Sequence, residues 1–275
     1  MRLAISNFAW NPAEDLEIFE LLRSYEIDAI DVAPGKYFLN PKETKSEEIW
    51  RVRSWWNERG IEITGMQSLL FGTSGLNMFG EVSIQNRMLE HLKSICRIGA
   101  GLGATRLVFG SPKNRDRSGL SDEQAQSRAV DFFRSLGDIA ADFGVIVCLE
   151  PNPQRYGANF MLSSVETLQV VKAVDHKAIR MQFDTGALTL NGESPDDILS
   201  RVADWVGHVH ASEPDLKPLG DLDTDHGQIG KAVARHLPDH LVSIEMLATS
   251  EEPHVQSIQR ALICAKRFYN SAREI

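Results

Sequence analysis

Short apolar runs alternate along the chain with longer segments whose apolar residues recur at helical spacing. Continuous runs rich in Val, Ile and Leu are typical of strands buried on both faces of a parallel sheet. The predicted strands cover residues 3–6, 27–32, 61–66, 105–109, 145–150, 179–184, 205–210 and 241–245. The predicted helices cover residues 12–25, 46–59, 83–102 and 121–144, begin again at 163, and then cover 195–202, 227–236 and about 253–273.

Capping residues at the ends of the predicted helices support these assignments. Ser121 is followed three residues later by Gln124, and Ser163 is followed by Glu166, so each pair predicts a capping box at a helix N-terminus. Gly144 predicts the end of the helix that begins at Ser121. Strand and helix therefore alternate eight times without a linker.

Eight strand–helix units with right-handed crossovers predict a single-domain (β/α)₈ TIM barrel over residues 1–275. The alternative is an open, doubly wound sheet. That fold would favour a glycine-rich loop after the first strand, whereas this strand is followed by Asn7-Phe-Ala-Trp10. The barrel is the preferred interpretation.

Four predicted strands each end in a residue that can bind a metal: Glu150, Asp184, His210 and Glu245. In a barrel the carboxyl ends of all strands meet on one face, so these side chains should converge. Ionised carboxylates there repel one another and are costly to desolvate unless a cation lies among them. The alternative is a set of structural ion pairs. Such a donor set suits Mn²⁺, Mg²⁺, Co²⁺ or Zn²⁺, and the lack of cysteine argues against structural zinc.

Bulk composition narrows the class of protein. The net charge is −9, which disfavours nucleic acid as a partner because phosphates require Lys and Arg. No apolar run is long enough for a membrane span, and the N-terminus lacks the apolar core of a signal peptide. The three cysteines are far apart in apolar patterns, which predicts free thiols in the cytoplasm.

Polar and aromatic residues after the strands are candidates for binding a small molecule. Lys113, Asn114 and Arg115 can bind a phosphate or carboxylate, or can form a solvated charge cluster. The segment 211–225 is long for a barrel loop, which is typical of a lid or a binding loop. Further candidates for substrate contact are Asn7, Trp10, Gln67, Asn152, Tyr156, Glu213, Lys217 and His226.

Two features have a structural interpretation. His208 alternates with His210 and is expected to face the helices as a core histidine. The loop 69–82 is apolar outside any helix pattern, so it should either cover substrate or meet another subunit of a homo-oligomer.

The four metal-ligand segments resemble the metal-site motifs of the xylose isomerase-like TIM-barrel superfamily, and the resemblance covers essentially the whole chain. These segments are Cys148-Leu-Glu-Pro-Asn-Pro153, Gln182-Phe-Asp-Thr-Gly186, His208-Val-His-Ala-Ser-Glu213 and Ser243-Ile-Glu-Met246. The resemblance implies one divalent metal, Mn²⁺ by preference, held by Glu150, Asp184, His210 and Glu245. It also implies a small carbohydrate substrate.

Resemblance to the ketose 3-epimerases of that superfamily implies a mechanism. Glu150 and Glu245 would stand on opposite sides of a substrate carbon, one removing a proton and the other returning it through an enediolate. The chain departs from those enzymes at three substrate-holding positions, where it has Tyr156, Ala187 and Leu216. A free ketohexose is therefore no better supported than another polyol, a sugar acid or a phosphorylated sugar.

Three rival functions remain. A lyase of the inosose dehydratase type would use the same metal with Tyr156 or His226 as the acid. A protein that binds metal and sugar without turnover is consistent with the three departures. An apurinic endonuclease is disfavoured, because the second to fourth predicted strands lack the histidines that its multi-metal site needs and because the net charge is −9.

Overall fold

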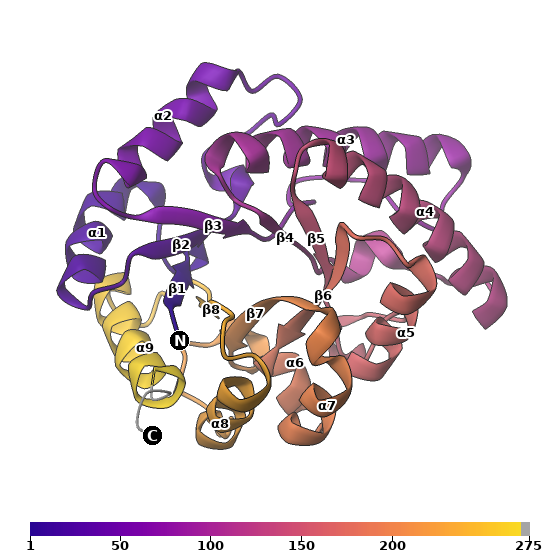
Figure 1. Cartoon of the computed structure of the whole chain (residues 1–275). Helices are drawn as coiled ribbons and strands as arrows, with labels where there is room; N and C mark the ends of the chain where they lie inside the picture. The colour runs from indigo at the N-terminus through magenta and orange to yellow at the C-terminus, as the bar shows by residue number, and fades with distance from the viewer. Residues whose placement is uncertain (271–275) are drawn as a thin grey trace.

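Eight parallel strands form a closed barrel in the computed structural model, which describes residues 1–270. The strands neighbour one another in chain order, and β8 pairs with β1 to close the ring. Figure 1 looks along the barrel, with the strands at the centre and the helices around them. The strands are β1 Leu3–Ser6, β2 Ala29–Val32, β3 Glu62–Met66, β4 Arg106–Phe109, β5 Ile146–Leu149, β6 Ile179–Asp184, β7 Val206–Ser212 and β8 Val242–Glu245. The predicted barrel is confirmed and the open sheet is excluded.

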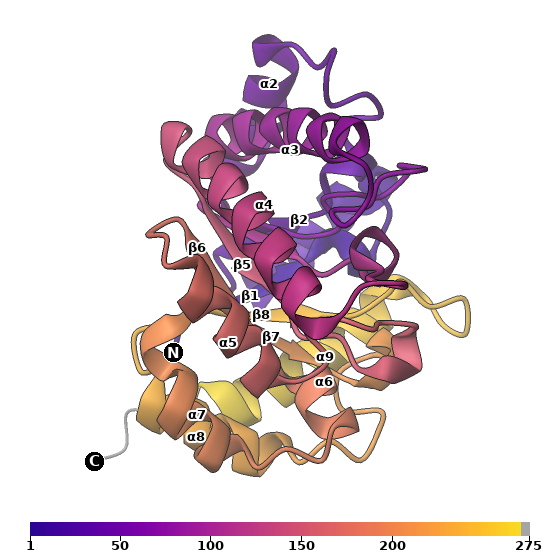
Figure 2. The same cartoon turned by 90° about the vertical axis from the view of Figure 1, so that its right-hand side faces the viewer.

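The helices form an outer layer in which most sequence neighbours pack together, and the last helix returns to pack against the first. Figure 2 shows α3 and α4 side by side on the outside of the barrel. Within residues 1–270 the helices are α1 Asp15–Ser24, α2 Ser46–Asn57, α3 Val82–Leu102, α4 Asp122–Asp142, α5 Ser164–Val174, α6 Thr185–Leu190, α7 Pro195–Val202, α8 His226–His236 and α9 His254–Tyr269.

Side-chain caps fix several helix ends. Ser121 accepts a hydrogen bond from the backbone of Gln124 and Gln124 accepts one from Ser121, so the predicted capping box of α4 is present. At α5 only half of the predicted box forms. Ser163 caps the Glu166 amide, but the Glu166 carboxylate accepts from Leu162 instead of Ser163.

Most predicted boundaries shift by one to three residues, and three differences concern the site or the chain's last helix. The short helix α6 was not predicted, because its six residues follow Asp184 directly and are too few to show a helical period. Strand β7 continues two residues past the predicted end at His210, to Ser212. The closing helix ends at Tyr269, and residues 271–273 of its predicted span lie outside the described residues.

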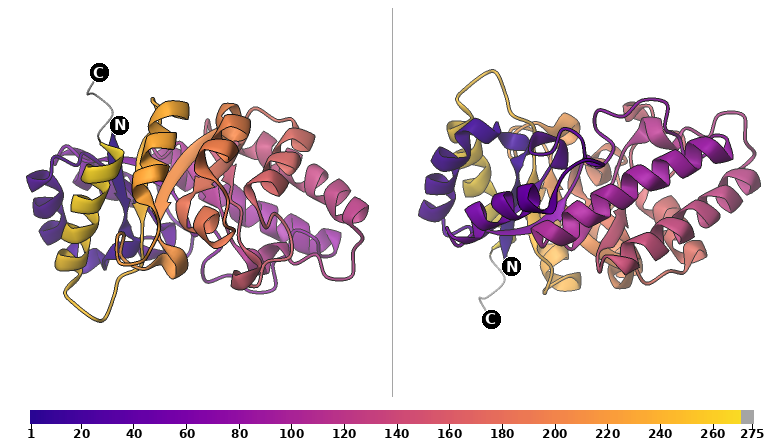
Figure 3. Two further views of the ribbon diagram at one scale, coloured as in Figure 1. Left: turned by 90° about the horizontal axis from the view of Figure 1, so that it is seen from below. Right: turned by 90° about the horizontal axis from the view of Figure 1, so that it is seen from above.

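The loop 69–82 owes its apolar character to packing. Figure 3 shows the barrel from the side, with the N-terminus at one end and the loop after β8 at the other. The hydrophobic core buries residues of the loop 69–82 that include Leu69, Leu70, Met78 and Phe79, whereas Phe71 is 78% exposed. Among the large apolar residues of this loop that precede α3, Phe71 is thus the exposed one, and it can still contact a ligand or another subunit.

All three cysteines are free, as expected. None of the helices in residues 1–270 combines the length and the apolar character that a membrane span requires.

Candidate active site

The structure brings the four strand-end residues together. Glu150 directly follows β5, Asp184 ends β6, His210 lies in β7 and Glu245 ends β8. One possible ligand atom from each lies within 4.8 Å of all the others. Asp184 and His210 are direct partners in the parallel register of β6 and β7, which places their side chains at the same level of the barrel. Four neighbouring strands therefore build one cluster.

The imidazole of His210 is fully buried and turns its Nδ1 atom toward the carboxylates. Nδ1 lies 3.1 Å from Glu245 Oε2 and 3.7 Å from Glu150 Oε1. The other ring nitrogen, Nε2, lies 3.8 Å from Asp31 Oδ2. This orientation makes Nδ1 the nitrogen that can bind a metal, while Nε2 faces the Asp31 carboxylate beyond hydrogen-bond distance.

His208 corrects an expectation. It does not face the helices but points into the barrel. There its Nε2 lies 2.7 Å from Oδ2 of Asp31, which belongs to β2 on the opposite side of the barrel. The reason is the strand period of two, which puts residues 208 and 210 on the same face of β7. Burial alone would raise the pKa of the Asp31 carboxyl, but the neighbouring imidazoles of His208 and His210 hold this pKa far below its usual range. The predicted burial of His208 is confirmed.

Asp184 is held by two hydrogen bonds. Its Oδ1 accepts from the backbone of Ala187 at 2.7 Å, which caps α6, and its Oδ2 accepts from Ser212 Oγ at 2.7 Å. Burial, together with the negative charges of Glu150 and Glu245, raises the pKa of Asp184 to about 7. Burial lowers the pKa of His210, but the charge of Glu245 and the interactions with Asp31 and Glu150 together outweigh this effect, and the pKa lies well above its usual range.

The cluster fits a divalent cation by two observations. First, Glu150 Oε1 is buried and has no hydrogen-bond partner within residues 1–270, although it faces His210. Second, three carboxylates and one imidazole form a hard, mainly oxygen donor set that matches Mn²⁺ or Mg²⁺ and also accepts Co²⁺ or Zn²⁺. A cation would offset the repulsion that raises the pKa of Asp184.

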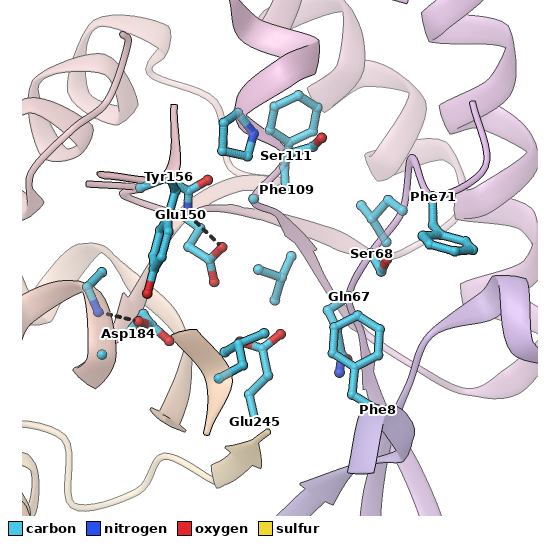
Figure 4. A pocket seen from close by; sticks show the side chains of 18 of the residues that line it. Phe8, Gln67, Ser68, Phe71, Phe109, Ser111, Glu150, Tyr156, Asp184 and Glu245 are labelled. Carbon is cyan, nitrogen blue, oxygen red and sulfur yellow. Dashed lines mark hydrogen bonds between the residues drawn. The ribbon is translucent and has the colours of Figure 1, made fainter. Parts of the chain in front are cut away.

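A cavity of about 550 Å³ opens above the cluster. Three of the four cluster residues line it, and the fourth, His210, is buried behind them. Figure 4 shows Glu150, Asp184 and Glu245 pointing into one space, with Gln67, Phe8 and Phe71 across from them. The predicted contact residues that line the cavity are Gln67, Lys113, Asn152, Tyr156 and Glu213.

Three predicted contact residues lie instead in the packing around the cavity. Trp10 is fully buried and donates from Nε1 to Asp15 at 2.7 Å. Asn7 accepts from the Ala33 amide at 2.7 Å. Asn114 donates to the Leu76 carbonyl at 2.8 Å and ties the two loops together. None of the three lines the cavity, because Asn7 and Asn114 bind neighbouring backbone groups and Trp10 binds the Asp15 carboxylate.

The remaining three predicted contact residues also lie outside the lining. Arg115 is fully buried, donates to the Glu150 carbonyl at 2.7 Å, and has its pKa lowered by burial to about 10. Lys217 is exposed and lies 3.5 Å from Glu251. His226 is buried between the Tyr269 hydroxyl and Glu213, at 2.7 and 3.0 Å. These residues position the site's backbone or its loop.

Sequence reasoning missed several residues of this site. Asp31 lies inside its strand and not at its end, where site residues are expected, yet a lone carboxylate within the apolar run Ala29-Ile-Asp-Val32 is a signal of a buried polar site. Ser212 was missed because β7 was expected to end earlier. Gly110 was missed too, and any side chain there would overlap the Glu150 carboxylate.

A sequence profile described as "xylose isomerase-like TIM barrel" matches residues 19–262. The chain belongs to the xylose isomerase-like TIM-barrel family. The resemblance inferred from the four motifs is confirmed.

Within this family, one curated relative is the D-psicose 3-epimerase of Ruminiclostridium cellulolyticum, with 27% identity over 107 residues. The match covers 39% of this chain and 36% of the epimerase, so it spans only about a third of that relative. This chain therefore shares sequence with a sugar epimerase over part of each chain.

Two solved structures share the fold over nearly the whole length. A D-psicose 3-epimerase with D-tagatose from Clostridium cellulolyticum H10 has a TM-score of 0.81 at 18% identity, covering 98% of this chain and 99% of that one. The IOLI protein with a binding zinc atom has a TM-score of 0.75 at 16% identity, covering both chains fully. At these identities the likeness shows the family fold.

Proposed function

We propose that this protein is a divalent-metal-dependent isomerase or epimerase that acts on a small carbohydrate. One observation carries the proposal. Glu150 and Glu245 approach the same imidazole nitrogen, at 3.7 and 3.1 Å, at the floor of a cavity of about 550 Å³. Two carboxylates facing one substrate carbon are what proton removal and return require. The partial match to a D-psicose 3-epimerase supports a sugar as the substrate class.

The metal would be held by Glu150, Asp184, His210 and Glu245, and Mn²⁺ is our preferred ion. When bound, it would polarise a sugar carbonyl and stabilise the negative charge that develops as the neighbouring C–H proton leaves. The neighbour with a zinc atom, the IOLI protein, supports a divalent ion in this fold. Because ligands of this kind bind in deprotonated form, the four residues also set the pH range of binding.

The protein's own groups supply the remaining chemistry. One of the two glutamates removes the proton and the other returns it, and the stereochemistry of the substrate decides which acts first. Gln67 and Asn152 line the cavity, and their carbonyl oxygens have no hydrogen-bond partner within residues 1–270. Both atoms are therefore ready acceptors for sugar hydroxyls, which orient the substrate.

The lyase alternative has weaker support. Of its two candidate acids, His226 is engaged by Tyr269 and Glu213 away from the cavity. Tyr156 remains: it lines the cavity, but its hydroxyl accepts a hydrogen bond from the Asp215 amide at 2.7 Å. Burial raises the pKa of Tyr156, so this hydroxyl stays protonated at neutral pH.

The test starts with metal content by elemental mass spectrometry on wild type and Asp184→Ala, purified side by side without added metal. We expect about one equivalent in wild type and loss in the variant. The loaded protein is then incubated with ketoses in D₂O. Deuterium beside the carbonyl with the carbon skeleton retained supports an isomerase or epimerase, and loss of water supports the lyase. A metal-free wild type whose melting temperature ignores added cations overturns the proposal.

A further inference from the structure

The cavity has a polar floor and an apolar upper wall. Three backbone segments build this wall as one continuous edge: the Leu247 amide donates to the Leu216 carbonyl at 2.9 Å, and the next amide, Ala248, donates to the Phe8 carbonyl at 2.9 Å. Side chains of Phe8, Leu216 and Leu247 all line the cavity. The ends of β1, β7 and β8 thus present apolar groups beside Glu245.

At the mouth of the cavity, Phe71 adds an aromatic face. It is 78% exposed and Leu247 is 48% exposed, yet both line the cavity. The other large apolar residues of the Phe71 loop are buried in the core. Figure 4 shows Phe71 and Phe8 on the side of the cavity away from Asp184 and Tyr156. Exposed apolar side chains at a cavity mouth mark a binding surface more than isolated surface residues do.

Backbone conformation keeps part of this wall in place. Leu216 has a φ of 51° and follows Asp215 with a φ of 58°, and Ser68, three residues before Phe71, has a φ of 59°. A left-handed conformation is unfavourable for a residue with a side chain, and for a leucine it is rare. The loop after β7 and the loop after β3 therefore each contain a strained turn, which orients Leu216 and Phe71.

The charges of the cavity disfavour an anionic substrate. Among the residues of the described range 1–270 that line it, Lys113 is the one cation, whereas the carboxylates are Glu150, Asp184, Glu213, Asp215 and Glu245. Arg155 pairs with Asp215 at 2.7 Å, so the four other carboxylates decide the charge of the lining. Against them stand Lys113 and one divalent cation, which leaves the lining weakly negative. Lys113 is exposed and lies near the Thr73 carbonyl, and the Arg115 guanidinium is buried outside the cavity. A phosphate or carboxylate on the substrate would meet net repulsion.

We infer that the substrate is a neutral sugar that carries an apolar group, such as the aglycone of a glycoside or an aromatic ether. The sugar ring or chain lies on the polar floor with its carbonyl toward Glu150 and Glu245. The apolar group lies between Phe71 and the edge formed by Phe8, Leu216 and Leu247. A cavity of about 550 Å³ is in the range that holds drug-sized ligands, which a substituted sugar fills better than a single free sugar. This inference rests on the proposed function.

The test compares three forms of the same ketose on Mn²⁺-loaded protein by isothermal titration calorimetry. The probes are D-fructose, 6-O-benzyl-D-fructose and D-fructose 6-phosphate, with the same three forms of D-tagatose to vary stereochemistry. We expect at least one benzyl ether to bind about tenfold tighter than its parent or better, because the ring buries apolar area. The phosphates should bind no tighter than the parents.

Variants locate the effect. The exposed Phe71 and Leu247 are changed together to serine, and Leu39→Ser, 94% exposed and outside the cavity, is the matched control. The double variant should reduce the benzyl-to-parent affinity ratio to about one, and the control should keep the wild-type ratio. The inference is overturned if no benzyl ether binds better than its parent, if a phosphate binds tightest, or if the ratio survives the double variant.

The two proposals fail separately. Metal binding and deuterium uptake into unsubstituted ketoses, without any benzyl preference, would reject the substituted substrate and leave the isomerase or epimerase standing. A benzyl preference in a protein that never exchanges deuterium would reject turnover and retain the ligand class.

Discussion

At the scale of single residues, each glutamate of the cluster has two oxygens for two tasks. Glu245 Oε2 lies 3.1 Å from His210 Nδ1, the atom that marks the metal position, so the other oxygen is free to face a substrate carbon. Glu150 shares its Oε2 with Asn152 at 3.1 Å and leaves Oε1 without a partner within residues 1–270. The same carboxylate can therefore bind an ion and transfer a proton.

Glu245→Gln tests this double role with little change of shape. An amide cannot take a proton and is a weaker ligand, so kcat/KM for proton exchange should fall by about 10²-fold or more. The assay is deuterium uptake at saturating Mn²⁺. Glu251→Gln is the matched control, because Glu251 is exposed and pairs only loosely with Lys217 at 3.5 Å. Full activity in Glu245→Gln contradicts the mechanism.

Asp31→Asn tests the support behind His210. The buried Asp31 carboxylate lies 2.7 Å from His208 Nε2 and 3.8 Å from His210 Nε2, and it accepts from Thr64 at 2.9 Å. Loss of its charge should loosen the imidazole and weaken Mn²⁺ affinity by about 10- to 100-fold. Titration of the metal-free protein measures this, with circular dichroism to check folding. The exposed Asp28 provides the control Asp28→Asn, and equal affinity in both variants would remove Asp31 from the site.

At the scale of elements, the strand ends were predictable and the loops were not. Buried parallel strands have a strong apolar signature, so the residue that ends each strand, such as Asp184, could be placed at one face from the sequence. Loop side chains depend on local turns. Trp10 and Asn114 turn inward, while Phe71 stays outside after the left-handed turn at Ser68, and no short pattern encodes that choice.

The close contact between β4 and β5 gives a prediction at this scale. Gly110 follows β4, and a Cβ there would overlap Glu150 Oε2. Gly110→Ala should therefore displace the Glu150 carboxylate and reduce metal content without unfolding the barrel. Elemental analysis and thermal melting are measured together. Gly35→Ala is the control, since its Cβ would make only an ordinary 3.5 Å contact with Phe71. Unchanged metal content in Gly110→Ala would show that Glu150 has room to shift.

At the scale of the whole molecule, repulsion within the carboxylate cluster destabilises the fold, and a bound cation offsets this repulsion. Three carboxylates with one imidazole lie in a buried cluster of a chain whose net charge is −9. A ligand that binds only the folded state stabilises it by RT ln(1 + [L]/Kd), about 2.7 kcal/mol at a hundredfold excess over Kd. For a chain of this size, chelation with EDTA should lower the melting temperature by about 5 °C, and Mn²⁺ should restore it. A melting temperature that ignores both additions contradicts this.

Asp184→Asn separates stability from function. Asparagine keeps an oxygen for the Ala187 amide, at 2.7 Å in wild type, but removes the charge that repels Glu150 and Glu245. The folded pKa of Asp184 is raised from 3.8 to about 7, so in the metal-free protein its ionisation destabilises the fold increasingly above pH 3.8 and fully above pH 7. Metal-free Asp184→Asn should therefore melt higher than metal-free wild type, by more at pH 8 than at pH 5, and should lose the Mn²⁺ shift. A lower melting temperature at pH 8 would mean that Asp184 is kept for packing, whereas the expected result means that it is kept for the metal at the expense of stability.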